Sequence, residues 1–179
     1  DNQPQAACGW ARGLCASYPE AMSILVCGGA GYIGAHVVRL LRQRGDRVVV
    51  VDDLSTSNAA RVGDTPLVRL DVATDEARSV LSNLMVDEDV TAVIHFSARK
   101  QVGESVARPA WYYQQNIGGM ANVLAAMEDA GVDQMIFSSS AAVYGIPTAE
   151  VVTEDMAGHP INPYGETKLI GEWMMADCE

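Results

Sequence analysis

The sequence predicts an α/β fold, a doubly wound parallel sheet, from three observations. Short apolar runs alternate with longer stretches of helical periodicity, a glycine cluster follows the first run, and helix start signals precede the last stretch. Strands and helices that alternate in this way form a parallel sheet with helices on both faces. The segment 1–21 fits no such unit. We expect a disordered extension there, or else an ordered cap, with Met22 as the native start and one domain over 22–179.

The segment Ile24–Gly34, ILVCGGAGYIG, predicts a strand, a tight turn and the start of a helix. Gly28 would allow a turn that a β-carbon obstructs, Gly31 close approach to a pyrophosphate, and Gly34 close packing of helix on strand. The first turn of the helix offers unpaired N–H groups and a positive dipole end to phosphates. Gly45 would end this helix, and its apolar face would consist of Ile33, Val37, Leu40 and Leu41.

The second strand, Arg47–Val51, ends at a carboxylate. Asp52 comes 18 residues after Gly34, near the distance at which an acidic side chain binds the adenosine ribose of a dinucleotide. The sequence favours NAD over NADP as cofactor, because this carboxylate would repel a 2′-phosphate and no arginine follows it directly. A polar loop over 53–65, where cofactor contacts could lie, comes next.

The third strand is predicted at Leu67–Leu70 and is closed by Asp71. We expect Thr74 to cap a helix that continues to Met85, because threonine side chains accept hydrogen bonds from the first turn. Acidic residues in that turn would favour the positive end of the helix dipole. These acidic residues are Asp75 and Glu76, and the inward positions are Val80, Leu81 and Leu84.

The fourth strand, Ala92–Phe96, is continuously apolar, as a parallel strand buried on both faces should be. After a polar loop over 97–108, Pro109 opens a long helix that Gly131 ends. Gln134–Phe137 is the fifth strand. Ligands bind such sheets beyond the carboxyl ends of the strands. The apolar positions of the long helix are Ile117, Met120, Val123, Leu124 and Met127.

Three serines, 138–140, follow the fifth strand, and the last helix carries a tyrosine and a lysine. Asn162 and Pro163 are suited to cap and open that helix. Tyr164 and Lys168 are four residues apart and share one helix face. An ammonium and an oxidised nicotinamide nearby would lower the pKa of the phenol, and a serine could relay its proton. This set predicts an oxidoreductase site for an alcohol carbon, although at least one serine should only bind loop backbone.

Composition excludes several classes of partner. The chain has 12 basic and 23 acidic residues, a formal net charge of -11 and no basic cluster, which argues against nucleic acid. No apolar run reaches the roughly 20 residues of a membrane helix, so we expect no membrane partner. The four cysteines lack metal-ligand spacing and suit reduced thiols in a cytosol, with a disulfide between Cys8 and Cys15 as the alternative. We predict no metal site, and structural roles for His36, His95 and His159.

Several motifs together resemble the extended short-chain dehydrogenase/reductase family. They are GGAGYIG, HFSARKQVGESV, Tyr112–Asn116, FSSSAAVYG and the Tyr164-x-x-x-Lys168 pattern, and the resemblance extends from Ser23 to the end of the chain. It implies a Rossmann-type sheet, truncated before the final strands and the smaller substrate domain. We therefore expect a fragment with weak or no activity alone.

Within that family the motifs are most similar to those of members that epimerise sugar nucleotides at C4. The resemblance implies retained NAD, a UDP-sugar substrate, and interconversion of UDP-glucose and UDP-galactose by transient oxidation at C4. It also implies a cytoplasmic isomerase of galactose metabolism that is a homodimer at full length.

The resemblance also implies individual roles. Ser140 and Tyr164 would be catalytic, and Lys168 would bind the nicotinamide ribose and lower the pKa of the tyrosine. The pyrophosphate would lie against Gly28, Gly31, Tyr32, Ile33 and Gly34, the adenosine ribose against Asp52, the adenine against Asp71 and Val72, and the rest of NAD against Phe96, Ser97, Lys100, Asn116 and Ser138. The chain departs from the family pattern at Cys27, Asp53, Ser97 and Ala142.

The sequence is also compatible with other functions. An epimerase for a pentose or N-acetylated sugar nucleotide, a decarboxylase, or a non-catalytic NAD-binding module fits the same motifs. A dehydratase is disfavoured because Ala141 and Ala142 stand where its acid and base would be. The helix 109–130, with Tyr112, Met120 and Leu124, is a candidate dimer face or ordinary core.

Overall fold

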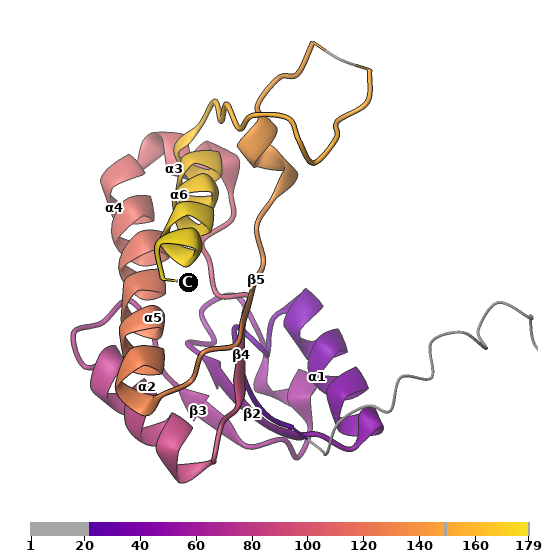
Figure 1. Ribbon diagram of the computed structural model, residues 1–179, viewed down its shortest axis with the longest axis vertical. Helices are drawn as coiled ribbons and strands as arrows, with labels where there is room; N and C mark the ends of the chain where they lie inside the picture. Colours follow the sequence, from indigo (N-terminus) through magenta and orange to yellow (C-terminus); the bar gives the residue numbers. More distant parts are fainter. Residues whose placement is uncertain (1–21, 149, 179) are drawn as a thin grey trace, which may run out of the picture.

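The structure is a computed structural model and describes residues 22–148 and 150–178. The expectations for 1–21, including the Cys8–Cys15 disulfide, lie outside the described residues. Five parallel strands form one sheet in the order β3-β2-β1-β4-β5 (Figure 1). The strands are β1 (Ser23–Cys27), β2 (Arg47–Asp52), β3 (Leu67–Arg69), β4 (Ala92–His95) and β5 (Met135–Phe137). The predicted fold class is confirmed.

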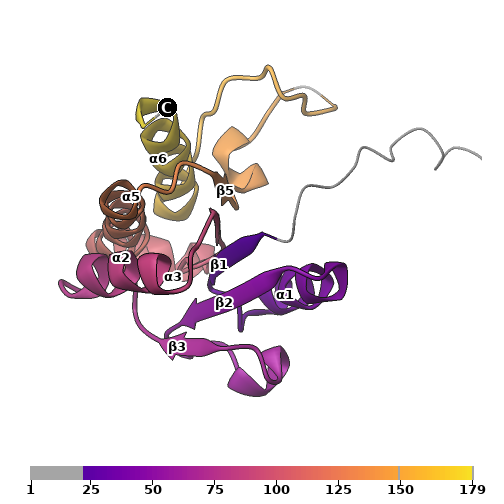
Figure 2. The same ribbon diagram turned by 60° about the horizontal axis from the view of Figure 1, so that its bottom comes forward.

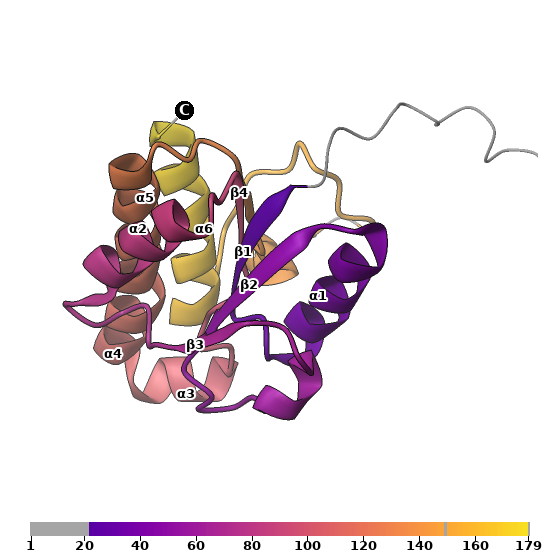
Figure 3. The ribbon, with the colours of Figure 1, turned by 90° about the horizontal axis from the view of Figure 1, so that it is seen from below.

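Helices cover both faces of this sheet. In Figures 2 and 3, α1 lies on one side of the sheet, and α2 and α5 lie together on the other side. A π-helical segment, Gln114–Gly118, joins α4 directly to α5, so the long helix predicted from Pro109 to Gly131 contains one wider turn. The helices are α1 (Tyr32–Arg44), α2 (Ala77–Asp87), α3 (Val102–Ala107), α4 (Pro109–Tyr113), α5 (Gly119–Ala130) and α6 (Pro163–Asp177).

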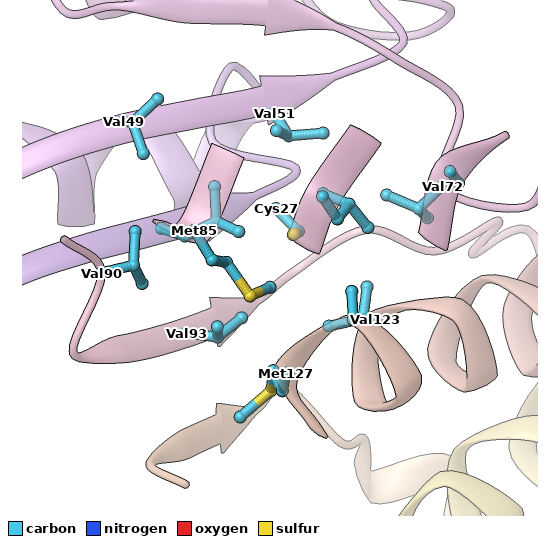
Figure 4. Close-up of a cluster of buried hydrophobic side chains, with 13 residues drawn as sticks. Cys27, Val49, Val51, Val72, Met85, Val90, Val93, Val123 and Met127 are labelled. Atoms are coloured by element: carbon cyan, nitrogen blue, oxygen red, sulfur yellow. The ribbon is translucent and has the colours of Figure 1, made fainter. Parts of the chain in front are cut away.

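Successive residues of the central strands enter two separate hydrophobic clusters. Leu25 and Cys27 of β1 join the cluster under α2 and α5, shown in Figure 4, whereas Ile24 and Val26 join the cluster under α1. Each fully buried aliphatic side chain stabilises the fold by about 1.5–3 kcal/mol relative to an exposed one. Burial on both faces explains why these strands are continuously apolar rather than alternating.

The inward face of α1 differs from the prediction. Gly34 and Val38 are buried, whereas Ile33 and Leu40 are 59% and 58% exposed. Of the predicted apolar face, Val37 and Leu41 pack against the core, whereas Ile33 and Leu40 lie outside it. The orientation of α1 has a physical reason. Gly34 contacts the preceding turn closely, so the side of the helix that carries Gly34 faces the sheet.

The start of α2 also differs from the prediction. The helix begins at Ala77, and Thr74 does not cap it, because Thr74 Oγ1 donates a 2.9 Å hydrogen bond to the carbonyl of Asp71. Asp71 Oδ1 in turn accepts from Ala73 N at 2.9 Å. These bonds form a turn over 71–74, and the two acidic residues at 75 and 76 precede the helix.

Two predicted loops contain short helices. The segment 97–108 includes α3, and the segment 53–65 includes a 3-10 helix at Ala59–Val62. Tyr112, which is fully buried, fixes the start of α3, because its hydroxyl accepts a 2.9 Å hydrogen bond from Gln101 N. Met120 is also buried, so these two residues belong to the core and not to an exposed dimer face.

Candidate active site

A cavity of about 350 Å³ lies at the carboxyl ends of the strands. In an open α/β sheet this edge binds ligands at the point where the strand order reverses, here between β1 and β4. The cavity is lined by every residue that the sequence analysis proposed for catalysis or cofactor binding. The fold therefore brings residues from position 28 to position 168 into one site.

The glycine-rich turn forms one wall of the cavity. Gly28 has φ 77, and a β-carbon on it would lie 2.6 Å from Ser97 N at the end of β4. A β-carbon on Gly34 would lie 2.3 Å from Gly28 O. The predicted turn at Gly28 is confirmed, and the close packing at Gly34 is against this turn and not against β1 itself. Gly31 is the N-cap of α1 and has no side chain that would cover the first N–H groups of the helix.

Asp52 lies at the end of β2 and is only 6% exposed. Its Oδ2 accepts a 3.0 Å hydrogen bond from Ala30 N, and its Oδ1 accepts from Leu54 N at 2.9 Å. Ser57 Oγ donates to the same Oδ1 at 2.6 Å. The carboxylate thus ties the glycine-rich turn to the loop after β2, in addition to lining the cavity.

Cys27, one of the departures from the family pattern, does not line the cavity. Its side chain is fully buried in the cluster under α2 and α5 (Figure 4). Burial, together with the charge of Asp52, raises the pKa of the Cys27 thiol to about 12. The residue therefore acts as a small protonated core side chain.

Asn116 is a structural brace as well as a lining residue. Its Oδ1 accepts from Arg99 N at 2.8 Å, and its Nδ2 donates to Arg99 O and to Thr167 Oγ1, both at 3.0 Å. These three bonds use both protons of the amide nitrogen. Asn116 therefore joins the loop after β4 to helix α6.

Helix α6 begins as predicted and approaches the sheet closely. Asn162 Oδ1 accepts a 2.9 Å hydrogen bond from Gly165 N, and Pro163 is the first helical residue. A β-carbon on Gly165 would lie 2.6 Å from Ala142 O, and one on Gly171 would lie 2.6 Å from the Phe137 ring. Gly171 therefore allows α6 to pack against the end of β5, and Gly165 allows it to pack against the 3-10 helix Ala141–Tyr144 that follows.

Lys168 is almost fully buried at this contact. Its Nζ donates a 2.8 Å hydrogen bond to Ser138 O and lies 4.7 Å from the centre of the Phe137 ring. Burial lowers the pKa of Lys168 to about 8. Tyr164 lines the same cavity one helical turn earlier, so the predicted shared face of α6 is confirmed.

His95 lies behind the site at the end of β4. Its ring is stacked on Phe137 with centroids 6.0 Å apart, and its Nδ1 is buried without a hydrogen-bond partner. Burial, and secondarily the charge of Lys168, lowers the pKa of His95 to about 3. A neutral imidazole in this position fits the predicted structural role.

The three serines after β5 have different environments. Ser140 Oγ accepts a 3.2 Å hydrogen bond from Ala142 N, and Ser139 Oγ donates to Glu172. The prediction that at least one serine binds loop backbone is confirmed for Ser140. Because its oxygen only accepts in this bond, the Ser140 hydroxyl still has a proton to donate into the cavity.

Sequence reasoning missed part of the lining. The missed residues come mainly from the loop after β2 and from the segment after β4, and they are Asp53, Ser55, Thr56, Ser57, Leu70, Ala98, Arg99, Gln115 and Ser139. The polar loop over 53–65 was a general signal for the first group. Nothing local in the sequence marks Arg99, whose contacts come from three distant segments.

Comparison with known proteins agrees with this geometry. The profile of the NAD dependent epimerase/dehydratase family matches residues 24–179. The chain belongs to this family. The family's dependence on NAD agrees with the cofactor predicted from the glycine spacing and Asp52.

Individual members of the NAD dependent epimerase/dehydratase family are also similar. UDP-glucose 4-epimerase of Lactobacillus helveticus is 46% identical over 155 residues, which are 87% of this chain and 46% of the relative. The corresponding enzyme of Bacillus subtilis is 42% identical over 161 residues, covering 87% of this chain and 48% of the relative. The predicted resemblance is confirmed, and the chain spans about half the length of these relatives.

A solved structure gives the same result for the fold. The crystal structure of UDP-glucose 4-epimerase from Brucella ovis in complex with NAD superposes with a TM-score of 0.83 at 44% identity. It covers 88% of this chain, and this chain covers 47% of it. The sheet whose strand ends form the cavity is therefore also present in a solved member of the family.

In the ranges 22–148 and 150–178, no group of three or more histidine, cysteine or acidic side chains could hold a metal ion. None of the helices within those ranges has the length and apolar character needed to cross a membrane.

Proposed function

We propose that the chain is the NAD-binding part of an epimerase that interconverts UDP-glucose and UDP-galactose by transient oxidation at C4. The observation that carries this proposal is the single cavity that joins the glycine-rich turn to Tyr164, Lys168 and Ser140. The proposed dinucleotide-binding turn and the proposed residues for oxidation of an alcohol thus line the same cavity. The similarity to UDP-glucose 4-epimerases at 42–46% identity supports the choice of substrate.

The residues present fit NAD. Gly28, Gly31 and Gly34 line the cavity without side chains, and α1 presents its positive end there without a side-chain cap. Asp52 offers carboxylate oxygens for ribose hydroxyls, and Asp71 and Val72 line the cavity from the end of β3. When bound, NAD would accept a hydride from the sugar and return it.

The chain's own residues would transfer the proton and hold the reacting oxygen of the sugar. Tyr164, as phenolate, would take the proton of the 4-hydroxyl group and later return it. The buried ammonium of Lys168 would favour that negative charge, and the Ser140 hydroxyl would donate a hydrogen bond to the sugar oxygen. Oxidation and reduction at one carbon would then invert its configuration without net change of the cofactor.

The alternatives within the family differ at the substrate. Ala141 and Ala142 follow Ser140 and carry no group that transfers a proton, which disfavours elimination of water by a dehydratase. An epimerase or decarboxylase for another sugar nucleotide would use the same cavity. A non-catalytic NAD-binding module would bind the cofactor without exchange of hydride.

One experiment separates these functions. The purified chain is denatured and the released nucleotide identified, and UDP-galactose is then offered to the chain alone and to its full reading frame. NAD in the released material and UDP-glucose as product support the proposal. If NAD is released but UDP-hexoses are not converted, the protein acts on another sugar nucleotide or only binds NAD. If no NAD is released, the proposal as a whole is contradicted.

We also propose that the full-length protein is a cytoplasmic homodimer. The two cysteines in the described part of the chain, Cys27 and Cys178, are free, which suits a reducing compartment. Twofold dimers are the commonest oligomers. Light scattering of the full reading frame tests the dimer, and fractionation of the source cells tests the compartment.

A further inference from the structure

The side chain of Arg99 connects three other segments around the cavity. Its Nη2 lies 2.7 Å from Asp53 Oδ2 and 3.6 Å from Asp71 Oδ2, and its Nε donates a 2.9 Å hydrogen bond to Gln115. Its Nη1 donates to the hydroxyl of Ser55. We call this set of contacts the Arg99 bridge. It joins the loops after β2, β3 and β4 to the π-helical segment before α5.

The bridge is held in place on all sides. The backbone N–H and carbonyl of Arg99 both bind the side chain of Asn116, and the guanidinium lies 5.3 Å from the Trp111 ring centre. The side chains of Arg99 and Asp53 are only 19% and 26% exposed. Water and salt therefore screen this ion pair less than a pair on the open surface.

Asp53 is ionised in this pair. Burial alone would raise its pKa, but hydrogen bonds from Ser55 and the charge of Arg99 outweigh burial, so the pKa of Asp53 is lowered. If the loops separated, the carboxylate of Asp53 and the guanidinium of Arg99, both partly buried, would lose their ion pair. Breaking such a pair is costly because each charge loses its partner.

The position of the bridge relates it to the cofactor site. Asp53 follows Asp52 directly, and Asp71 contacts the guanidinium, while both Asp52 and Asp71 are proposed adenosine-binding residues. Asp53, Asp71 and Arg99 all line the cavity. The bridge thus spans the loops that carry the adenosine end of the proposed site.

We propose that the Arg99 bridge controls how fast NAD leaves the cavity, by holding the loops after β2 and β4 together at the adenosine end. This inference rests on the proposed function, because it takes NAD as the bound ligand. It gives Arg99 and Asp53 a role in retaining the cofactor through the turnover cycle.

The test measures the release of NAD rather than turnover. The chain is loaded with NAD, freed of excess nucleotide, and mixed with a large excess of ADP-ribose that captures emptied sites. We expect Arg99→Leu and Asp53→Asn each to release NAD about tenfold faster, which corresponds to about 1.4 kcal/mol. The double variant should be no faster than Arg99→Leu alone, because Arg99→Leu already removes the ion pair that Asp53→Asn weakens.

Arg78→Leu is the matched control. Arg78 and Asp129 form an ion pair with contacts of 2.7 Å between α2 and α5, and neither residue lines the cavity. This variant should release NAD at the unmodified rate. A second readout, release of radiolabelled ADP-ribose, should accelerate by the same factor as NAD, because ADP-ribose keeps the adenosine end and lacks nicotinamide.

The outcomes distinguish the two proposals. Unchanged release from Arg99→Leu and Asp53→Asn, with NAD bound by the unmodified chain, overturns the bridge and leaves the proposed function standing. The bridge is also overturned if the acceleration of NAD release in the double variant equals the product of the accelerations in the two single variants. Failure of the unmodified chain to bind NAD overturns both proposals. Asp53→Asn, which keeps the size of the side chain, carries the test if Arg99→Leu does not fold.

Discussion

Lys168 Nζ donates a 2.8 Å hydrogen bond to the carbonyl oxygen of Ser138, a residue 30 positions earlier in the chain. This bond joins helix α6 to the carboxyl end of β5 and holds a buried ammonium beneath the cavity. The proposed catalytic pair of Tyr164 and Lys168 is therefore positioned by the carboxyl end of β5.

The buried Lys168 should make stability rise in alkaline solution. Its pKa is about 8 in the fold against 10.5 in the unfolded chain, so between these values the unfolded chain binds more protons and the free energy of unfolding increases with pH. The gain should be about 2–3 kcal/mol by pH 10.5. Urea denaturation from pH 7 to 10.5 should show this rise in the unmodified chain and not in Lys168→Met. Parallel pH profiles for the two proteins would contradict the prediction.

His95 should make the fold sensitive to acid. Its pKa is about 3 in the fold against 6.5 when unfolded, so stability present above pH 6.5 is lost as the pH falls toward 3. The loss should amount to several kcal/mol at about 1.4 kcal/mol per pH unit. His95→Phe should flatten the denaturation profile between pH 6.5 and 4, whereas the same change at the exposed His36 should not.

Gly34→Ala should destabilise the fold strongly. The new β-carbon would lie 2.3 Å from Gly28 O and 2.7 Å from Gly29 Cα, so the turn or the helix must move. We expect a loss of about 3 kcal/mol in the free energy of unfolding. The control is Gly103→Ala in α3, where no atom lies within 4 Å and helix propensity should add about 0.5–1 kcal/mol. Equal midpoints in urea for the two variants would refute the proposed packing role of Gly34.

Tyr164→Phe should separate cofactor binding from chemistry. The change removes the hydroxyl that would transfer the proton and keeps the ring, so NAD should still bind. Interconversion of UDP-hexoses by the full reading frame should fall about 10²–10⁴-fold. Tyr113→Phe loses a hydroxyl bound to Glu166 outside the cavity and should keep most activity. Retained activity in Tyr164→Phe would remove this residue from the mechanism.

Asp52→Asn should weaken both the fold and NAD binding. An amide oxygen cannot replace both carboxylate oxygens, which accept from Ala30 N, Leu54 N and Ser57 Oγ. We expect a loss of about 1.5 kcal/mol in unfolding free energy and a Kd for NAD raised about tenfold. Isothermal calorimetry measures the affinity, and Asp129→Asn, in α5 and outside the cavity, is the control for NAD binding. An unchanged Kd would place the adenosine ribose elsewhere.

Much of the fold followed from local pattern. The apolar runs predicted all five strands within one or two residues. The central strands β1, β2 and β4 are buried on both faces and have the recognisable composition of such strands, whereas β3 and β5 are only partly buried. The helix boundaries were less certain. Thr74 looked like a cap, but the side chain of Asp71 and the hydroxyl of Thr74 stabilise a turn instead, and α2 begins three residues later.

The glycine turn, the parallel α/β architecture and the cavity residues near Gly28, Asp52, Tyr164 and Lys168 could all be predicted from the order of residues in the chain. Spacing along the chain specifies backbone conformation and the face on which each of these residues lies. In contrast, the contact of Asn116 with α6 and the position of Arg99 across the cavity wall depend on the folded arrangement of distant segments. The strand order places the ends of β2 and β4 on either side of β1, and the partners of a long polar side chain depend on which distant loops the sheet brings together.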